Sequence, residues 1–351
     1  MKYKLSELAQ IKYGKDHKKL ENGNIPVYGT GGLMRKVNNF LYSGESVLIP
    51  RKGSLNNVMF VTGKFWTVDT MFWTKINSKK VLPKYLYYCL SRINLSALNV
   101  GSAVPSLTIK ILNEIRLDIP SLSKQKEIVK KLAPFERKIR LNNQINANLF
   151  ELTKNYWELF KSNYKTKYLS ISELANKVVT GKTPSKKKKE YYENGNVPFI
   201  KIPDMHGRVF VTDSTEHLST VGANSQKSKF IPKGSIIVSC IGTPGLVAMT
   251  SKRCQTNQQI NSIIIDSKIV YAVFLELQNL RKYIINLGSG GTTISNLNKS
   301  DFQNIKLSVP SIDKMCMFDV EVQPIFQQIL SNELENKNLD RIKNELLMKL
   351  F

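Results

Sequence analysis

The residue types that most often carry out chemistry are sparse in this sequence and form no established catalytic pattern. The three histidines lack the spacing of metal ligands: His17, His206 and His217. Gly181-Lys182-Thr183 is similar to the end of a phosphate-binding loop, but Asn176 stands where that motif requires a glycine. The glycine-rich stretches at residues 29–32 and 288–291 do not match a dinucleotide-binding fingerprint. We therefore expect no catalytic residues, no cofactor and no metal site.

The four cysteines are scattered without a paired C-x-x-C spacing: Cys89, Cys240, Cys254 and Cys316. Such a pattern favours buried, reduced thiols over a zinc site or a disulfide framework. No apolar run reaches the roughly 20 residues of a membrane span, and the first residues lack the apolar block of a signal peptide. We expect a cytoplasmic protein that does not engage a membrane.

Charge is the strongest compositional signal. The 351 residues include 52 Lys and Arg against 27 Asp and Glu, a formal net charge of +25, and the isoelectric point is near 9.8. An excess of this size predicts a polyanionic partner, and nucleic acid is the commonest one. The alternative is a surface that is simply rich in lysine, although acidic residues would then be expected to keep pace.

The chain is internally duplicated. Residues 121–160 return as residues 311–350 at a constant offset, with apolar and asparagine positions at alternating spacings of four and three, which is typical of a coiled-coil seam. Ser-Glu-Leu-Ala recurs at residues 6–9 and 172–175, and Glu-Asn-Gly-Asn-(Ile/Val)-Pro at 21–26 and 193–198. The order is therefore globular unit, long helix, globular unit, long helix, an α+β arrangement with boundaries at residues 1–119, 120–165, 166–309 and 310–351.

Each globular unit should contain a similar series of elements. We expect a helix over residues 4–15, with Ser6 as its N-cap, and its counterpart over 170–182. The other expected elements are strands at 46–50, 58–62, 67–76, 235–241, 246–250 and 258–265, helices at 83–93 and 272–284, and small-residue loops at 101–106 and 288–293.

The two long helices should pair with each other as an antiparallel coiled coil. Positions that sum to 478 then face each other, which places Asn142 opposite Asn336 and Asn146 opposite Asn332. The alternative is that these asparagines face solvent. Because a proline removes a helical hydrogen bond and crowds the preceding turn, we also expect a kink or break at Pro134 and at Pro324.

Taken in order, these motifs resemble the specificity subunit of type I restriction-modification enzymes. The resemblance covers the whole chain and is carried by the paired S-E-L-A and Asn-Gly-Asn motifs, LIPRKGS at residues 48–54, GSAVPSL at 101–107, and IPSLSKQKEIV at 119–129 leading into a long helix. The first copy is short, and VPSIDKMCMF at 309–318 departs from the usual Gln- and Glu-rich start of the second helix.

The resemblance implies a non-catalytic subunit. Residues 1–119 and 166–309 would be target recognition domains that each bind one half of a bipartite site on double-stranded DNA. The helical arms, 120–165 and 310–351, would set the spacing between the half-sites and dock methyltransferase subunits, two by expectation, with restriction subunits joining in the full complex. Two other hypotheses stay open: a self-sufficient DNA-modifying enzyme, and a structural protein that binds nucleic acid without sequence preference.

Polar loops beside the strands are the candidates for DNA contact, since Arg and Lys pair with guanine, Asn and Gln with adenine, and further basic residues with phosphates. The candidate DNA-binding residues are Tyr28, Thr30, Arg35, Lys36, Arg51, Lys52, Asn56, Lys186, Lys187, Lys201, Arg208, Lys227 and Thr243. For the lysine run at 186–189, a solvated charge run is an equal alternative.

Overall fold

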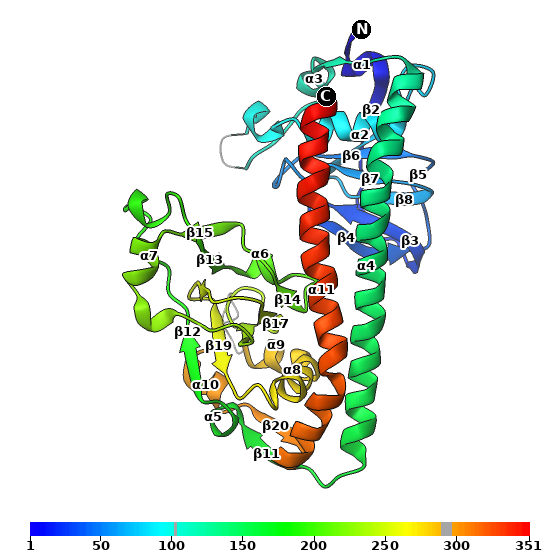
Figure 1. Ribbon diagram of the computed structural model, residues 1–351. Helices are drawn as coiled ribbons and strands as arrows, with labels where there is room; N and C mark the ends of the chain where they lie inside the picture. Colours follow the sequence, from blue (N-terminus) through cyan, green and yellow to red (C-terminus); the bar gives the residue numbers. More distant parts are fainter. Residues whose placement is uncertain (102–103, 289–296) are drawn as a thin grey trace. The chain divides into compact units, whose positions relative to one another are not determined.

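The computed structural model describes residues 1–351 except 102–103 and 289–296. The chain divides into two compact units, which we call unit 1 (Met1–Arg137 with Arg341–Phe351) and unit 2 (Lys138–Asp340). The long helices α4 (Leu122–Ser162) and α11 (Ile312–Leu350) contribute a segment to each unit (Figure 1).

Unit 1 is built on two four-stranded sheets, with strand orders β2-β9-β6-β7 and β4-β3-β8-β5. The strands are β1 (Lys2–Lys4), β2 (Ala9–Tyr13), β3 (Asn22–Gly29), β4 (Gly32–Val37), β5 (Tyr42–Ser43), β6 (Ser46–Pro50), β7 (Met59–Val61), β8 (Lys64–Thr67), β9 (Met71–Ile76) and β10 (Arg116–Asp118). The helices are α1 (Leu5–Leu8), α2 (Pro83–Ser91), η1 (Leu95–Leu98) and α3 (Ile109–Asn113). A short ribbon of β1 and β10 closes the unit.

Unit 2 contains a five-stranded sheet, β12-β19-β16-β17-β14, a three-stranded sheet, β15-β13-β18, and the ribbon β11-β20. The strands are β11 (Lys167–Ser170), β12 (Lys177–Thr180), β13 (Val197–Ile200), β14 (Phe210–Val211), β15 (Glu216–Leu218), β16 (Ile236–Ser239), β17 (Val247–Thr250), β18 (Gln255–Thr256), β19 (Ile260–Ile264) and β20 (Lys306–Val309). The helices are α5 (Ile171–Leu174), η2 (Lys189–Tyr191), α6 (Ile202–Met205), α7 (Thr220–Asn224), η3 (Lys227–Lys229), α8 (Val270–Asn279), α9 (Arg281–Gly288) and α10 (Lys299–Gln303).

The two units repeat one topology. In unit 1 the parallel pair β3 and β8 belongs to one sheet while β9 lies between β2 and β6 in the other. In unit 2 the parallel pair β13 and β18 and the position of β19 between β12 and β16 reproduce this arrangement. The duplication read from sequence is therefore a duplication of fold, with β14 added at the edge of the unit 2 sheet.

A continuous apolar strand lies at the centre of each unit. Alternate residues of β6 pack in two different clusters: Val47 and Ile49 with α2, and Leu48 with strands of the second sheet. In β16, Ile236 likewise packs with α8, and Ile237 with strands of the second sheet. Burial on both faces explains why residues 47–49 and 236–238 are consecutive apolar residues instead of alternating with polar ones.

The helix expected over residues 4–15 is wrong. Only Leu5–Leu8 is helical, its N-cap is Lys4 in place of Ser6, and the chain turns into β2 at Ala9. Ala9 and Ile11 are buried and the backbone pairs with β9, so sheet pairing overrides the local helical pattern. The counterpart at 170–182 is corrected in the same way, because α5 spans only Ile171–Leu174 and is followed by β12.

Two other expected elements are divided. The strand expected at 67–76 is β8 and β9 joined by a turn at 68–70, and in the second copy 257–259 form the equivalent turn before β19. These turns carry the chain from one sheet to the other. The helix expected at 272–284 is α8 and α9, with Leu280 between them. Of the expected loop at 288–293, residues 289–293 lie outside the described residues.

The long helices pair antiparallel in unit 2. Asn142 Nδ2 donates a hydrogen bond to Asn336 Oδ1 (2.9 Å), and Asn332 Nδ2 donates to Asn146 Oδ1 (2.7 Å). Asn142 is 1% exposed. The alternative in which these asparagines face solvent therefore does not hold for the buried members.

Of the kink or break expected at the helix prolines, the break is wrong, whereas the kink stays a prediction. α4 is continuous through Pro134, and α11 through Pro324. A proline removes one hydrogen bond, and the surrounding packing can offset that loss. Leu132 is fully buried just before Pro134, and Val322 and Phe326 are buried on either side of Pro324, so both helices are held along these turns.

Candidate nucleic-acid interface

A cluster of loops lies where four strands of unit 1 end. We call it loop cluster 1; it comprises residues 14–15, 28–30, 51–54 and 67–71. Its segments are joined by backbone hydrogen bonds, each written from amide N–H to carbonyl oxygen: Gly14 to Met71 (2.9 Å), Lys15 to Thr67 (2.9 Å), Val68 to Tyr28 (3.1 Å), Arg51 to Thr70 (2.8 Å) and Leu107 to Arg51 (2.9 Å). The turn at 68–70 is thus bonded to Tyr28 and Arg51, and the residues on either side of it, Thr67 and Met71, are bonded to residues 14–15.

Unit 2 contains the same construction, which we call loop cluster 2: residues 181–182, 200–202, 240–243 and 256–260. The corresponding backbone hydrogen bonds run from Gly181 to Ile260 (3.0 Å), Lys182 to Thr256 (3.0 Å), Asn257 to Ile200 (3.2 Å), Cys240 to Gln259 (2.8 Å) and Leu297 to Cys240 (2.9 Å). The five hydrogen bonds named above for loop cluster 1 therefore recur at equivalent residues.

Glycines make this geometry possible in both units. A Cβ atom on Gly14 would lie 2.0 Å from the carbonyl oxygen of Val68, and one on Gly181 would lie 2.1 Å from that of Asn257. Such contacts exclude any side chain at these two positions. The Gly-Lys dipeptide at 181–182, which resembles the end of a phosphate-binding loop, is the counterpart of the dipeptide at 14–15. In each unit it marks a close approach of the chain to the turn between the two sheets.

A second glycine pair shapes the loop after the central strand. Gly53 follows β6 with φ of +85°, and Gly242 follows β16 with φ of +80°. This left-handed conformation is readily adopted by glycine and disfavoured for other residues. The loops therefore turn at the same point in the two units although their side chains differ.

Four of the seven candidate residues in the first copy lie in loop cluster 1: Tyr28, Thr30, Arg51 and Lys52. Tyr28 is partly buried, which raises the pKa of its hydroxyl group. Lys52, by contrast, is exposed to solvent. Arg51 donates from Nη1 to the carbonyl oxygen of Asp69 (3.1 Å), and its guanidinium lies 5.3 Å from the centre of the Tyr13 ring. Arg51 is thus held at the surface of the cluster.

The other three candidates in the first copy have different surroundings. Arg35, on β4, donates to the carbonyl oxygens of His17 (3.1 Å) and Leu20, so its guanidinium holds the preceding loop in place. Asn56 accepts a hydrogen bond from the Ser96 amide (3.0 Å). Lys36 is exposed on β4 outside the cluster.

Only two of the six candidates in the second copy lie in loop cluster 2: Lys201 and Thr243. Thr243 is exposed, whereas Lys201 forms an ion pair with Glu216. Glu216 also pairs with Lys186 at 3.4 Å, although the Lys186 side chain is 63% exposed. These two lysines are therefore partly neutralised by one carboxylate.

The remaining candidates in the second copy lie outside the cluster. Lys187 and Lys227 are exposed to solvent but do not belong to loop cluster 2. Arg208 lines a hollow of about 580 Å³ together with Asn143, Asn146 and Arg281. Its position beside the long helices argues for a different role from that of the cluster residues.

Sequence reasoning missed several exposed cluster residues: Lys15, Asp69, Lys182 and Gln258. A signal for two of them was present, since Tyr-Gly-Lys and Thr-Gly-Lys end the two copies of the S-E-L-A segment. Asp69 and Gln258 had no comparable signal because they lay inside stretches assigned to strands.

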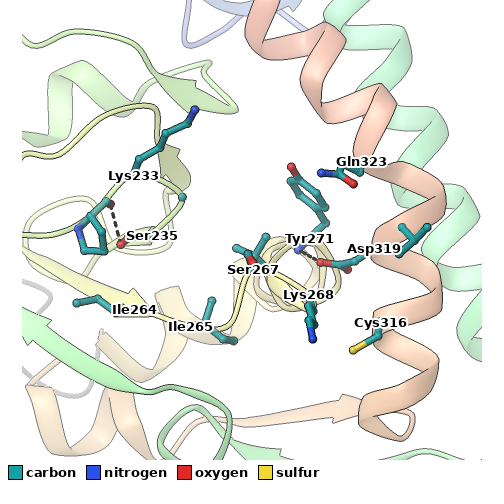
Figure 2. A pocket seen from close by; sticks show the side chains of 14 residues that line it. Lys233, Ser235, Ile264, Ile265, Ser267, Lys268, Tyr271, Cys316, Asp319 and Gln323 are labelled. Carbon is teal, nitrogen blue, oxygen red and sulfur yellow. Dashed lines mark hydrogen bonds between the residues drawn. The ribbon is translucent and has the colours of Figure 1, made fainter.

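Side chains of α11 attach the rest of unit 2 to the long helix. Asp319, 3% exposed, accepts hydrogen bonds from the amides of Tyr271 (2.7 Å) and Ala272 (2.8 Å) at the N-terminus of α8. Figure 2 shows this carboxylate directed at the start of α8, beside a cleft of about 520 Å³. Burial raises the pKa of Asp319 to about 7. The hydrogen bonds from the two amides act in the opposite direction, because they stabilise the ionised carboxylate.

A second buried carboxylate forms a similar attachment further along α11. Glu333 accepts hydrogen bonds from the amides of Val209 (3.2 Å) and Phe210 (3.2 Å) at the start of β14. Burial raises its pKa to about 7 as well, and the same amides oppose the rise. In unit 1 a neutral side chain of α4 makes a contact like that of Asp319. Gln125 Oε1 accepts a hydrogen bond from the Leu82 amide at the start of α2 (2.7 Å).

Comparison with known proteins identifies the family. The family described as Type I restriction modification DNA specificity domain matches residues 1–151 and 163–344. The chain belongs to this family of type I restriction-modification specificity subunits. The two matched ranges contain loop clusters 1 and 2, respectively, so the repeated geometry coincides with a repeated family domain. Within the described residues, no helix combines the length and apolarity needed to cross a membrane.

Individual relatives extend over most of the chain. The Type I restriction enzyme HindI specificity subunit of Haemophilus influenzae is 33% identical, over 83% of this chain and 80% of its own length. The Type I restriction enzyme MjaIX specificity subunit of Methanocaldococcus jannaschii is 24% identical, over 81% of this chain and 72% of its own. The crystal structure of the type I restriction-modification S subunit from M. genitalium shares the fold, with a TM-score of 0.55, 17% identity, and coverage of 100% of this chain and 96% of that one.

Proposed function

We propose that this specificity subunit directs a type I restriction-modification complex to a bipartite site on double-stranded DNA. Residues 1–119 and 166–309 act as target recognition domains, and each binds one half of the site. The observation that carries the proposal is the pair of loop clusters, which share a backbone hydrogen-bond pattern and differ in exposed side chains. Two domains that share a backbone frame but differ in exposed side chains can bind two different base sequences on the same DNA.

The arms, residues 120–165 and 310–351, set the spacing between the half-sites and dock two methyltransferase subunits. Restriction subunits join this core in the full complex, which acts in the cytoplasm. The chain itself is non-catalytic. Its net charge of +25 supports the proposal, because basic residues that neutralise phosphates supply affinity independent of sequence, to which base contacts add specificity.

An exchange of recognition domains tests the proposal. Residues 1–119 are replaced by the matching segment of a relative with a different site, and the methylated sequence is mapped in cells that carry the complete complex. One half of the methylated sequence should change and the other should stay. The reciprocal exchange of residues 166–309 is the matched control and should change the opposite half. A change in both halves from either exchange contradicts the modular function.

The two rival functions give different results. A self-sufficient DNA-modifying enzyme would transfer methyl groups to DNA, or cleave it, as the purified chain alone. A protein that binds nucleic acid without sequence preference would bind with a steep salt dependence but select no motif from a random DNA library.

A further inference from the structure

The two loop clusters share one backbone arrangement. Some of their exposed residues are the same in both clusters and others differ, and this contrast indicates which residues make contacts common to both half-sites and which make contacts specific to one. Lys15 and Lys182 occupy the same position, each following the glycine that approaches the turn between the sheets. At the centre of the turn the residues differ: Asp69-Thr70 in unit 1 corresponds to Gln258-Gln259 in unit 2. A contact common to both half-sites calls for the same residue, and a contact specific to one calls for a different residue.

The differing residues are held on a fixed backbone. In unit 1 the Val68 amide and the carbonyl groups of Thr67, Thr70 and Met71 all form hydrogen bonds to neighbouring segments. The equivalent groups of residues 256–260 are paired in unit 2. Side chains on a fixed turn can be placed accurately against a base edge, which loose loops achieve less well.

The polar groups of these side chains remain available. Asp69 is exposed, and its carboxylate has no hydrogen-bond or ion-pair partner among the described residues. Gln258 accepts a hydrogen bond at Oε1 from Thr183 (2.6 Å), and Gln259 accepts one at Oε1 from Asn257 (2.8 Å). The Nε2 groups of both glutamines have no acceptor in the described part of the chain, so they can donate to a ligand.

We propose that Asp69-Thr70 and Gln258-Gln259 read bases in the two half-sites, while Lys15 and Lys182 bind phosphates in both. The inference rests on the proposed function. A carboxylate accepts from the N4 amine of cytosine, and a glutamine can pair with the N6 and N7 edge of adenine. A lysine contacts phosphate as a point charge that carries no sequence information. Unit 1 thus contacts a cytosine, and unit 2 an adenine, through these turns.

An exchange of the turn residues tests base reading. The variants are Asp69→Gln with Thr70→Gln, and separately Gln258→Asp with Gln259→Thr, each assembled into the complete complex. The preferred sequence is selected from a random DNA library and compared with the methylated motif in cells. Each variant should change one or two positions in a single half-site and leave the other half intact. The control Glu45→Gln changes an exposed acidic residue of unit 1 outside the cluster and should preserve the motif.

Substitution of the shared lysines tests phosphate binding. Lys15→Ala and Lys182→Ala should each weaken binding to all sequences equally and reduce the slope of log affinity against log salt by about 1. The preferred motif should stay unchanged. Lys79→Ala, at an exposed lysine outside the cluster, should leave both affinity and slope unaltered. Thermal unfolding of every variant separates these effects from loss of folding.

Two outcomes overturn the inference. One is an unchanged motif in folded variants of the turn residues. The other is an altered motif in the lysine variants. Failure of the proposed function gives a different result, since the wild-type complex would then select no bipartite motif at all.

Discussion

Asn146 and Asn332 form a buried amide pair between the long helices. Asn332 Nδ2 donates to Asn146 Oδ1 (2.7 Å), and Asn146 Nδ2 donates to the carbonyl oxygen of Ile329 (3.2 Å). The single substitution Asn332→Leu leaves Asn146 Oδ1 buried without its donor. We expect a loss of about 1 to 3 kcal/mol in the free energy of unfolding, measured by denaturant titration, because an unsatisfied buried polar group bears its full desolvation cost.

The paired substitution separates this cost from loss of packing. Asn146→Leu combined with Asn332→Leu removes both polar partners and places two apolar side chains in the seam. The double variant should be more stable than the Asn332→Leu single variant. A double variant that loses the sum of the two single costs would show that the asparagines do not act as a pair.

Charge and residue type allowed only part of the candidate interface to be predicted. A basic residue in a polar loop indicates available charge, but its partner depends on residues brought near by folding. Arg35 donates to carbonyl groups of residues 17 and 20, and Lys201 pairs with Glu216, so neither is a free cation. Lys15 and Lys182 could have been found from the repeated Gly-Lys dipeptide, whereas nothing local distinguished Asp69.

At the scale of the element, α11 holds α8 and β14 through two buried carboxylates. The pKa values of Asp319 and Glu333 are raised to about 7 in the folded protein, above their ordinary values of 3.8 and 4.5. The folded state therefore binds more protons than the unfolded state between about pH 4 and pH 7. The free energy of unfolding should fall as pH rises through this window, by up to about 1.4 kcal/mol per pH unit for each group.

Neutral substitutions test whether these two carboxyl groups cause the pH dependence of the free energy of unfolding. Asp319→Asn and Glu333→Gln should each reduce the fall in unfolding free energy between pH 5 and pH 7, as measured by denaturant titration at both values. Asp313→Asn alters an exposed carboxylate in the first turn of the same helix and is the matched control. Equal pH dependence in the wild type and both buried-site variants would contradict the assignment.

The elements that sequence predicted well are those whose pattern is local. The long helices carry a sustained seam, and β6 is a continuous apolar run, so both were recognised. The S-E-L-A segments were misread because Leu5, Leu8 and Ile11 suit a helix as well as a turn followed by a strand. The distinction depends on β9, whose residues pair with those of β2 from 59 to 67 positions away.

At the scale of the whole molecule, the duplication repeats one fold and one long helix, so that the chain contains two similar units and two long helices. The units have diverged in side chains more than in backbone pattern, since the five cluster hydrogen bonds persist while residues 69 and 258 differ. Under the proposed function, such divergence would let the two units bind different half-sites on the same backbone frame. The arms would then set the distance between the half-sites.

Lengthening both arms by one heptad tests that role. Seven residues are inserted after residue 137 in α4 and after residue 340 in α11, so that both helices lengthen by the same amount. Seven residues are nearly two full helical turns and add about 10 Å, so the faces of the arms keep their orientation within about 20°.

At about 3.4 Å per base pair, the gap between half-sites should increase by at most about three base pairs, with both half-sites unchanged. Mapping of methylated positions in cells with the complete complex measures this. Insertion in α4 alone is the matched control. It leaves the asparagine pairs in register but shifts Ile128 and Leu132 of α4 by seven residues against Leu347 of α11 in unit 1, so it should reduce assembly. An unchanged gap in the double insertion would mean that the arms do not set the spacing.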